Sequence, residues 1–94
     1  MASEVKVIKV AKASDSKKVA GTIKYYLEKD GYCELDAIGA GAVYAVVISL
    51  SLLTCIFKCK YSCSMDYFHF VGENGKKHTG HKFSISLKEK EDLP

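Results

Sequence analysis

Hydrophobic and polar positions follow each other along the first third of the chain in a pattern that predicts a strand and then a helix. β-Branched residues with interleaved lysines predict a half-buried strand over residues 4–10. A side-chain oxygen of Ser14, Asp15 or Ser16 is suited to cap a helix that runs to about Lys29. Apolar residues recur there at three- and four-residue steps and form one buried stripe: Val19, Ile23, Tyr26 and Leu27. The Asp-Gly pair that follows is expected to end the helix, because glycine adopts the left-handed C-cap conformation at little steric cost.

A period of two then predicts a second strand over residues 32–38. Its apolar positions, Cys33, Leu35 and Ala37, alternate with acidic ones, so we expect one buried face and one wet face.

The segment from Ala37 to Phe57 carries no charge, and it has two interpretations. Its length is sufficient to cross a bilayer. Its first residues, however, complete the strand pattern, and glycines and hydroxyl residues interrupt it, which favours a helix over about 42–57 that packs on a sheet. We expect these residues to face the sheet: Val43, Val46, Val47, Leu50, Leu53 and Phe57.

The opposite face of this helix is too apolar for a lone helix in water. We expect a partner subunit or a second layer to cover it. The candidate interface residues are Tyr44, Ile48, Leu52 and Cys55, with Ser51 and Ile56 beside them.

Residues 61–71 and 76–88 are predicted to form a hairpin of two strands. The Asn74-Gly75 pair is suited to a tight turn between them. In the last strand Phe83, Ile85 and Leu87 alternate with polar residues, which indicates one buried face. The predicted order is β-α-β-α-β-β. It indicates an α/β protein of two-layer α+β type, with two helices on one face of a four-stranded mixed sheet.

Length and composition are those of one small globular domain. The chain has 94 residues and a hydrophobic fraction of 48%, which is enough for one modest core. We expect a single domain over 1–94, with its core at about 4–88 and a short charged tail at 89–94. The first residues show no basic segment followed by an apolar one, so we expect a cytoplasmic or nuclear location. The four cysteines are then expected to stay reduced.

Two motifs suggest a cofactor or a metal, and neither is favoured. Gly39-x-Gly41 between a strand and a helix could receive a phosphate, but Tyr44 stands where the dinucleotide fingerprint requires its third glycine. Close backbone packing is the preferred explanation of these glycines. A second set, Cys55, Cys59, Cys63 and His69, contains zinc-ligand types but crosses a helix-to-strand junction. We therefore expect no cofactor and no metal.

Catalysis is not predicted, because the sequence shows no nucleophile beside a base, and no paired carboxylates, at a recognisable spacing. No catalytic residue is assigned.

Several segments resemble a known family. Val19-Ala20-Gly21-x-Ile23, the helix end at 27–31 and the run Glu34-Leu35-Asp36-Ala37-Ile38-Gly39-Ala40-Gly41-Ala42 are similar to the stage V sporulation protein S family of the Alba-like superfamily. The similarity covers roughly residues 5–47. After Ala42 the chain departs from it, because the family's polar and basic Asn-Gln-Ala-Val-Lys is replaced by the apolar run Val43-Tyr44-Ala45-Val46-Val47.

The resemblance implies an Alba-like fold and a dimer that binds DNA or RNA without catalysis. Charge adds a modest argument for a polyanionic partner, since the net charge is +3 and all 14 basic residues are lysine. Lysine contacts phosphate as a point charge, without the planar fork of arginine. The candidate contacts border the first helix or lie on the last hairpin: Lys12, Lys17, Lys18, Lys76 and Lys77, with Lys82 further along the last strand.

The leading hypothesis is a homodimer or higher homo-oligomer that binds DNA or RNA through lysine-phosphate contacts. The alternative is a protein-interaction or oligomerisation module without nucleic-acid affinity, in which the lysines only keep the protein in solution. No membrane contact is expected in either case.

Overall fold

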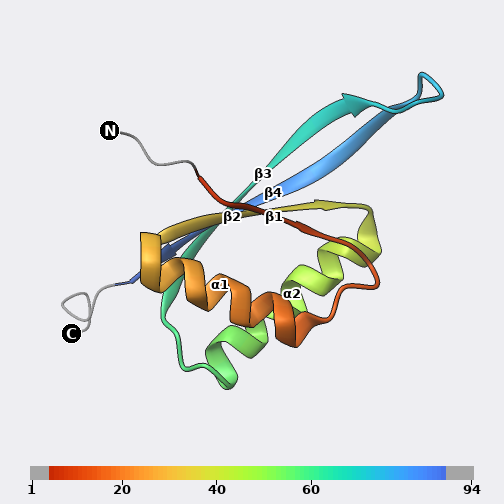
Figure 1. Cartoon of the computed structure of the whole chain (residues 1–94). Helices are drawn as coiled ribbons and strands as arrows, with labels where there is room; N and C mark the ends of the chain where they lie inside the picture. The colour runs from red at the N-terminus through yellow and green to blue at the C-terminus, as the bar shows by residue number, and fades with distance from the viewer. Residues whose placement is uncertain (1–4, 89–94) are drawn as a thin grey trace.

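Four strands and two helices follow one another in the predicted order (Figure 1). The computed structural model describes residues 5–88. The elements are β1 (Val7–Val10), α1 (Ser16–Asp30), β2 (Tyr32–Ile38), α2 (Ala40–Cys55), β3 (Tyr61–Val71) and β4 (Lys77–Leu87). Position 4 of the predicted first strand and the predicted charged tail at 89–94 lie outside the described residues.

The strands form one mixed sheet with the order β1-β2-β4-β3. β1 pairs with β2 in parallel, whereas β4 is antiparallel to both of its neighbours. Figure 1 shows α1 and α2 packed side by side on one face of the sheet. This face, called the helix side below, carries the fully buried residues of the two central strands: Cys33, Leu35, Ala37 and Ile85. The two-layer arrangement expected from the sequence is confirmed.

Helix α1 begins and ends as its sequence predicts. The Asp15 carboxylate caps the first turn by accepting hydrogen bonds from the backbone N–H groups of Lys17 and Lys18. At the other end Gly31 has φ of 77° and donates its N–H to the carbonyl of Leu27. The buried stripe differs in one residue from the expected one, since Ala20 is buried and Tyr26 is half-buried.

Helix α2 is displaced from its predicted bounds, and one of the six residues predicted to face the sheet is exposed. It runs over Ala40–Cys55 instead of about 42–57. The sequence predicts that Val47 faces the sheet, but 49% of its surface is exposed. The residues that do become buried are mostly small: Ala42, Ala45, Val46, Ser49 and Leu53. Of the predicted face, Val46 and Leu53 are buried, and Val43, Leu50 and Phe57 pack against the core. Because the helix is apolar on every side, hydrophobic periodicity could not determine where this face ends.

Small side chains on α2 bring a polar group into the core with its hydrogen bond satisfied. Ser49 is fully buried, and its hydroxyl donates a hydrogen bond of 2.7 Å to the carbonyl of Ala45. Ser16 at the start of α1 donates to the same carbonyl, at 3.5 Å. Among residues 5–88, no helix is both long enough and apolar enough to cross a membrane.

The β3–β4 hairpin projects beyond the rest of the sheet (Figure 1). β2 ends with Ile38 opposite Gly80, so the hairpin residues from 69 to 79 pair only with one another. Their connection is a loop over 72–76, in which the Gly75 N–H donates to the carbonyl of Gly72. Outside the glycines of the described chain, positive φ occurs only at Lys58. The Asn-Gly pair therefore does not form the tightest hairpin turn, which requires positive φ at both residues.

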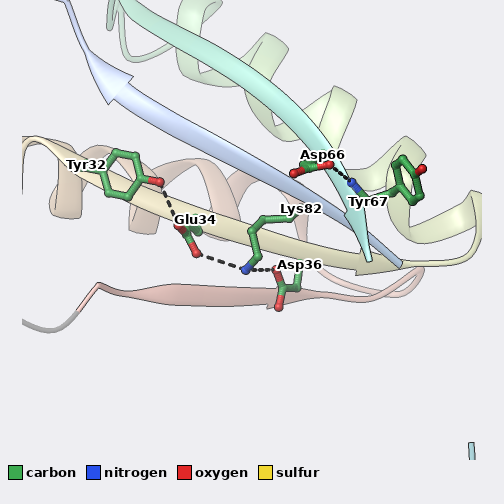
Figure 2. Close-up of polar contacts among 6 residues, drawn as sticks. All are labelled: Tyr32, Glu34, Asp36, Asp66, Tyr67 and Lys82. Atoms are coloured by element: carbon green, nitrogen blue, oxygen red, sulfur yellow. Dashed lines mark hydrogen bonds and ion pairs between the residues drawn. The ribbon is translucent and has the colours of Figure 1, made fainter. Parts of the chain in front are cut away.

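A polar network joins the central strands β2 and β4 (Figure 2). It lies on the face of the sheet away from the helices, called the open side. Lys82 of β4 donates to Asp36 Oδ1 at 2.9 Å and to Glu34 Oε1 at 3.1 Å. The Tyr32 hydroxyl donates to Glu34 Oε2 at 2.8 Å. Asp66, which lies opposite Lys82 on β3, instead accepts from the backbone N–H of Tyr67.

These contacts favour the charged forms of the groups involved. The hydrogen bond from Tyr32 and that from Lys82 hold the pKa of Glu34 below its ordinary value. The hydrogen bond to Asp36, supported by Glu34, raises the pKa of Lys82 against the opposing effect of desolvation. Glu34 and Lys82 therefore stay charged through the neutral pH range.

Replacement of Gly39 by alanine is expected to destabilise the protein, whereas the same change at Gly21 is expected to stabilise it. Gly39 has φ of 93° and ψ of 157°, a conformation that costs a residue with a side chain about 1–3 kcal/mol. Gly21 lies within α1, and an added Cβ would meet only the Phe57 ring, at an ordinary 3.8 Å. Alanine there should add about 0.5–1 kcal/mol. Urea denaturation of the two variants measures both effects, and a Gly39→Ala variant as stable as the wild type would contradict the first.

Lys82→Met is expected to lower the free energy of unfolding by about 1 kcal/mol at neutral pH, because it leaves two carboxylates without their cation. The Glu34 pKa is depressed in the folded state, so its contribution is present above its unfolded pKa of about 4.3 and is lost as the pH falls through the folded value. The difference between variant and wild type should therefore shrink at about pH 3.

The matched control is Lys24→Met, which removes an exposed pair with Glu28 on α1 and should cost no more than about 0.5 kcal/mol. Urea denaturation at the two pH values provides the measurement. Equal destabilisation by Lys82→Met at both would mean that Lys82 acts through packing and not through charge.

Candidate nucleic-acid interface

The sheet topology brings five separate chain features to one end of the molecule. β1 and β2 are parallel, and each runs directly into a helix that returns across the sheet. The carboxyl ends of both strands and the amino ends of both helices therefore lie together, and the hairpin tip projects from the same end (Figure 1).

The five candidate lysines all belong to this end, called the lysine end below. They are exposed, and they come from three segments: Lys12 from the β1–α1 loop, Lys17 and Lys18 from the first turn of α1, and Lys76 and Lys77 from the hairpin. In Figure 1 the hairpin tip stands on the open side, while the start of α1 lies on the helix side. The lysines thus form an extended border and not one compact cluster.

The five candidate lysines form no ion pair with any residue from 5 to 88. Between residues 5 and 88, ion pairs are formed by Lys24 and Lys82 alone. The sequence places Lys82 with the basic residues of the hairpin, but both of its ion-pair partners lie on β2, so it cannot be counted as free charge. The Asp15 carboxylate is occupied by two backbone N–H groups.

Lys12 is also the reason for the second glycine of the Gly-x-Gly motif. A Cβ built on Gly41 would lie 2.8 Å from Lys12 Cγ and 2.9 Å from its Cδ. The aliphatic part of Lys12 therefore crosses directly over the backbone of the first turn of α2. Together with the positive φ of Gly39, this contact accounts for both glycines by conformation and packing.

A second surface of interest is the apolar outer side of α2. Tyr44 is 66% exposed, and Cys55 is also exposed. Ile48 and Leu52 are half-buried, and Leu52 packs against the core of its own chain. Of the four predicted interface residues, Tyr44 and Cys55 are therefore available to a partner, whereas Ile48 and Leu52 are already partly covered by their own chain.

Sequence reasoning missed part of this surface. It predicts that Val47 is buried, and it does not single out Met65 and Tyr67, which are 63% and 62% exposed. Met65 lies opposite the buried Phe83, which places both β3 residues on the helix side of the sheet. The polar residues Ser64 and Asp66 on either side of Met65 were the signal that could have indicated this face. We call Tyr44, Val47, Met65 and Tyr67 the apolar patch.

The cysteines do not converge on a metal site in the part of the chain that the structure describes. No group of three or more His, Cys, Asp or Glu side chains could hold an ion there. Burial, with a smaller contribution from Glu34, raises the pKa of Cys33 to about 11, so this cysteine is a protonated core residue at neutral pH. The two histidines of β4, His78 and His81, point to opposite sides of the sheet, as their spacing predicts.

Comparisons with known proteins identify the family and the fold. The family model of stage V sporulation protein S (SpoVS) matches residues 6–88. Among solved structures, Alba from Thermoplasma volcanium matches with a TM-score of 0.59 and 16% sequence identity, over 86% of this chain and 99% of that one. The search of curated proteins gave no match. Since the family model covers nearly the whole described chain, the chain belongs to the stage V sporulation protein S family and has an Alba-like fold.

Proposed function

We propose that the protein is a dimeric, non-enzymatic nucleic-acid-binding protein that contacts phosphates through Lys12, Lys17, Lys18, Lys76 and Lys77. The observation that carries the proposal is the gathering of exposed lysines from three chain segments at one end, without ion-pair partners among residues 5–88. The Alba-like fold supports it, because the resemblance to that superfamily implies DNA or RNA binding.

Lysine contacts determine the character of the binding. A point charge neutralises phosphate without reading base edges, so the proposal is for DNA or RNA binding largely without sequence preference. Neutralised phosphates release counterions, and affinity must then fall steeply with salt. The proposal assigns no catalytic residue and no cofactor, in keeping with the same resemblance.

The dimer is proposed to form through the apolar patch. Its four side chains are each about half or more exposed, and they come from α2 and from the helix side of β3. Large apolar groups exposed on a small protein are typical of an interaction surface. A second copy of the chain is the proposed occupant, since it would double the lysines presented to one nucleic acid.

The same patch favours the second candidate function, a protein-interaction or oligomerisation module. In that case the patch assembles copies of the chain, and the lysines contribute only to solubility. The two candidates differ in one result, because assembly without affinity for DNA or RNA at low salt excludes the first and supports the second.

Lys76→Met with Lys77→Met is expected to weaken binding to duplex DNA and to RNA. The slope of log K against log salt concentration should also become shallower, by roughly one for each phosphate that is no longer neutralised. The matched control is Lys29→Met with Lys60→Met, which removes equal charge at the opposite end, in the last turn of α1 and the loop before β3. Fluorescence anisotropy over a salt series measures the binding of both double variants. Equal weakening in the two variants would show that net charge alone matters and that the lysine end has no special role.

Tyr44→Lys is expected to convert the dimer to a monomer, because it places a charge within the apolar patch. Tyr25→Lys is the control, since Tyr25 is similarly exposed but lies on α1. Light scattering gives the mass of each variant, and circular dichroism verifies that both are folded. A monomeric wild-type protein would contradict the proposed interface. Tyr44 is a better probe than Leu52, whose substitution would also disturb the core.

A further inference from the structure

The open side of the sheet contains a groove at the base of the projecting hairpin. Lys9 and Lys12 line it from the end of β1, and Phe68 and Phe70 line it from β3. Ile38 of β2, the strand between β1 and β4, also lines it. These five residues are called the aromatic groove. They are brought together across the whole width of the sheet, from one edge strand to the other.

The two phenylalanine rings are held in place by specific neighbours. Gly80 lies opposite Phe68, and a Cβ at Gly80 would stand only 2.3 Å from Phe68 Cζ. The Phe68 ring therefore lies over the bare backbone of β4, where any other residue would displace it. Phe70 stacks on His78, with ring centroids 5.2 Å apart and an interplanar angle of 25°. Phe68 and Phe70 are neighbours, with centroids 6.1 Å apart.

These rings do not belong to the core. Both helices cover the other side of the sheet, and the three aromatic side chains lie on the side without a covering layer. Phe68 and Phe70 remain half-buried, His78 is exposed, and Ile38 is 53% exposed. A row of aromatic rings is thus presented to solvent in a fixed arrangement.

The charged residues of the groove lining are Lys9, Lys12 and Asp36, so lysine is in excess within the lining. Lys9 and Lys12 are exposed and form no ion pair with any residue from 5 to 88. The acidic residue of the lining, Asp36, is paired with Lys82 at 2.9 Å, and the same lysine also pairs with Glu34. An anionic ligand with flat apolar rings matches this combination of lysine and aromatic side chains.

We propose that the aromatic groove binds unpaired bases of single-stranded nucleic acid, which stack on Phe68 and Phe70 while flanking phosphates contact Lys9 and Lys12. This inference rests on the proposed function, and it narrows the ligand from DNA or RNA in general to single strands. Stacking requires bases with accessible faces, and every base has such a face, so this contact adds affinity for single strands without adding sequence preference. A duplex keeps its base faces covered and can contact only the lysines.

The test separates stacking from phosphate contact by means of two labelled strands of about twelve nucleotides, a length within the range that small binding folds cover. One strand is oligothymidine, and the other is an abasic strand with the same number of phosphates. The wild-type protein should bind the oligothymidine more tightly than the abasic strand by roughly 5- to 100-fold.

Phe70→Leu is the informative variant, because leucine keeps an apolar side chain on the hairpin and removes the ring. It should lower the preference for the oligothymidine by roughly 5-fold or more, with the remainder due to the Phe68 ring, and leave affinity for the abasic strand unchanged. Phe70→Tyr, which keeps a ring, should retain the preference. Tyr25→Leu is the matched control on α1, outside the groove, and should behave as the wild type. Circular dichroism of each variant verifies the fold, and shifts of the Phe68 and Phe70 ring resonances on titration with oligothymidine locate the contact independently.

The outcomes distinguish this inference from the proposed function. Equal wild-type affinity for the two strands, or a full preference retained by Phe70→Leu, overturns the stacking proposal and leaves phosphate binding in place. Absence of binding to oligothymidine, to the abasic strand and to duplex DNA at low salt overturns both proposals. Ring resonances that stay unchanged while oligothymidine binds also reject the groove as the site.

Discussion

The complete burial of one side of β2 is the constraint on which the remaining structure depends. Cys33, Leu35 and Ala37 have no exposed surface, and they alternate with polar residues that cannot be placed in the core. Both helices must therefore cover the same side of the sheet. Because β1 and β2 are parallel, the helices that follow them also begin at the same end. The position of the lysine end is a consequence of this packing.

Because both helices cover the same side of the sheet, neither helix covers the open side. Without a second layer, its charges on the central strands remain near water, and Lys82 joins two carboxylates of the neighbouring strand. Because Lys82 is paired with these carboxylates, it does not add an unpaired positive charge to the hairpin. The pairing also provides Asp36, which lines the aromatic groove, with a cation.

Helix α2 contributes both to the core and to the proposed dimer interface. Its small residues pack inward, and several of its larger ones, including Tyr44 and Val47, remain outside. This distribution allows close approach of α2 to its neighbours while it leaves an apolar surface beyond what one chain can cover.

The sequence by itself determined the order and nearly all bounds of the strands, the cap at Asp15, the helix end at Gly31 and the alternating faces of β2 and β4. Each of these depends on neighbouring residues, whose period or backbone preference can be recognised locally. It also supplied the five candidate lysines and part of the apolar patch. Only the tertiary structure decided that Val47 of α2 stays exposed while Ala42, Ala45 and Ser49 are buried, because the edges of the buried face of an all-round apolar helix depend on which side chains its neighbours exclude by size. Only the tertiary structure paired Lys82 with Glu34 and Asp36 and brought Lys9 beside Phe68, since these contacts join residues far apart in the chain through strand order and register.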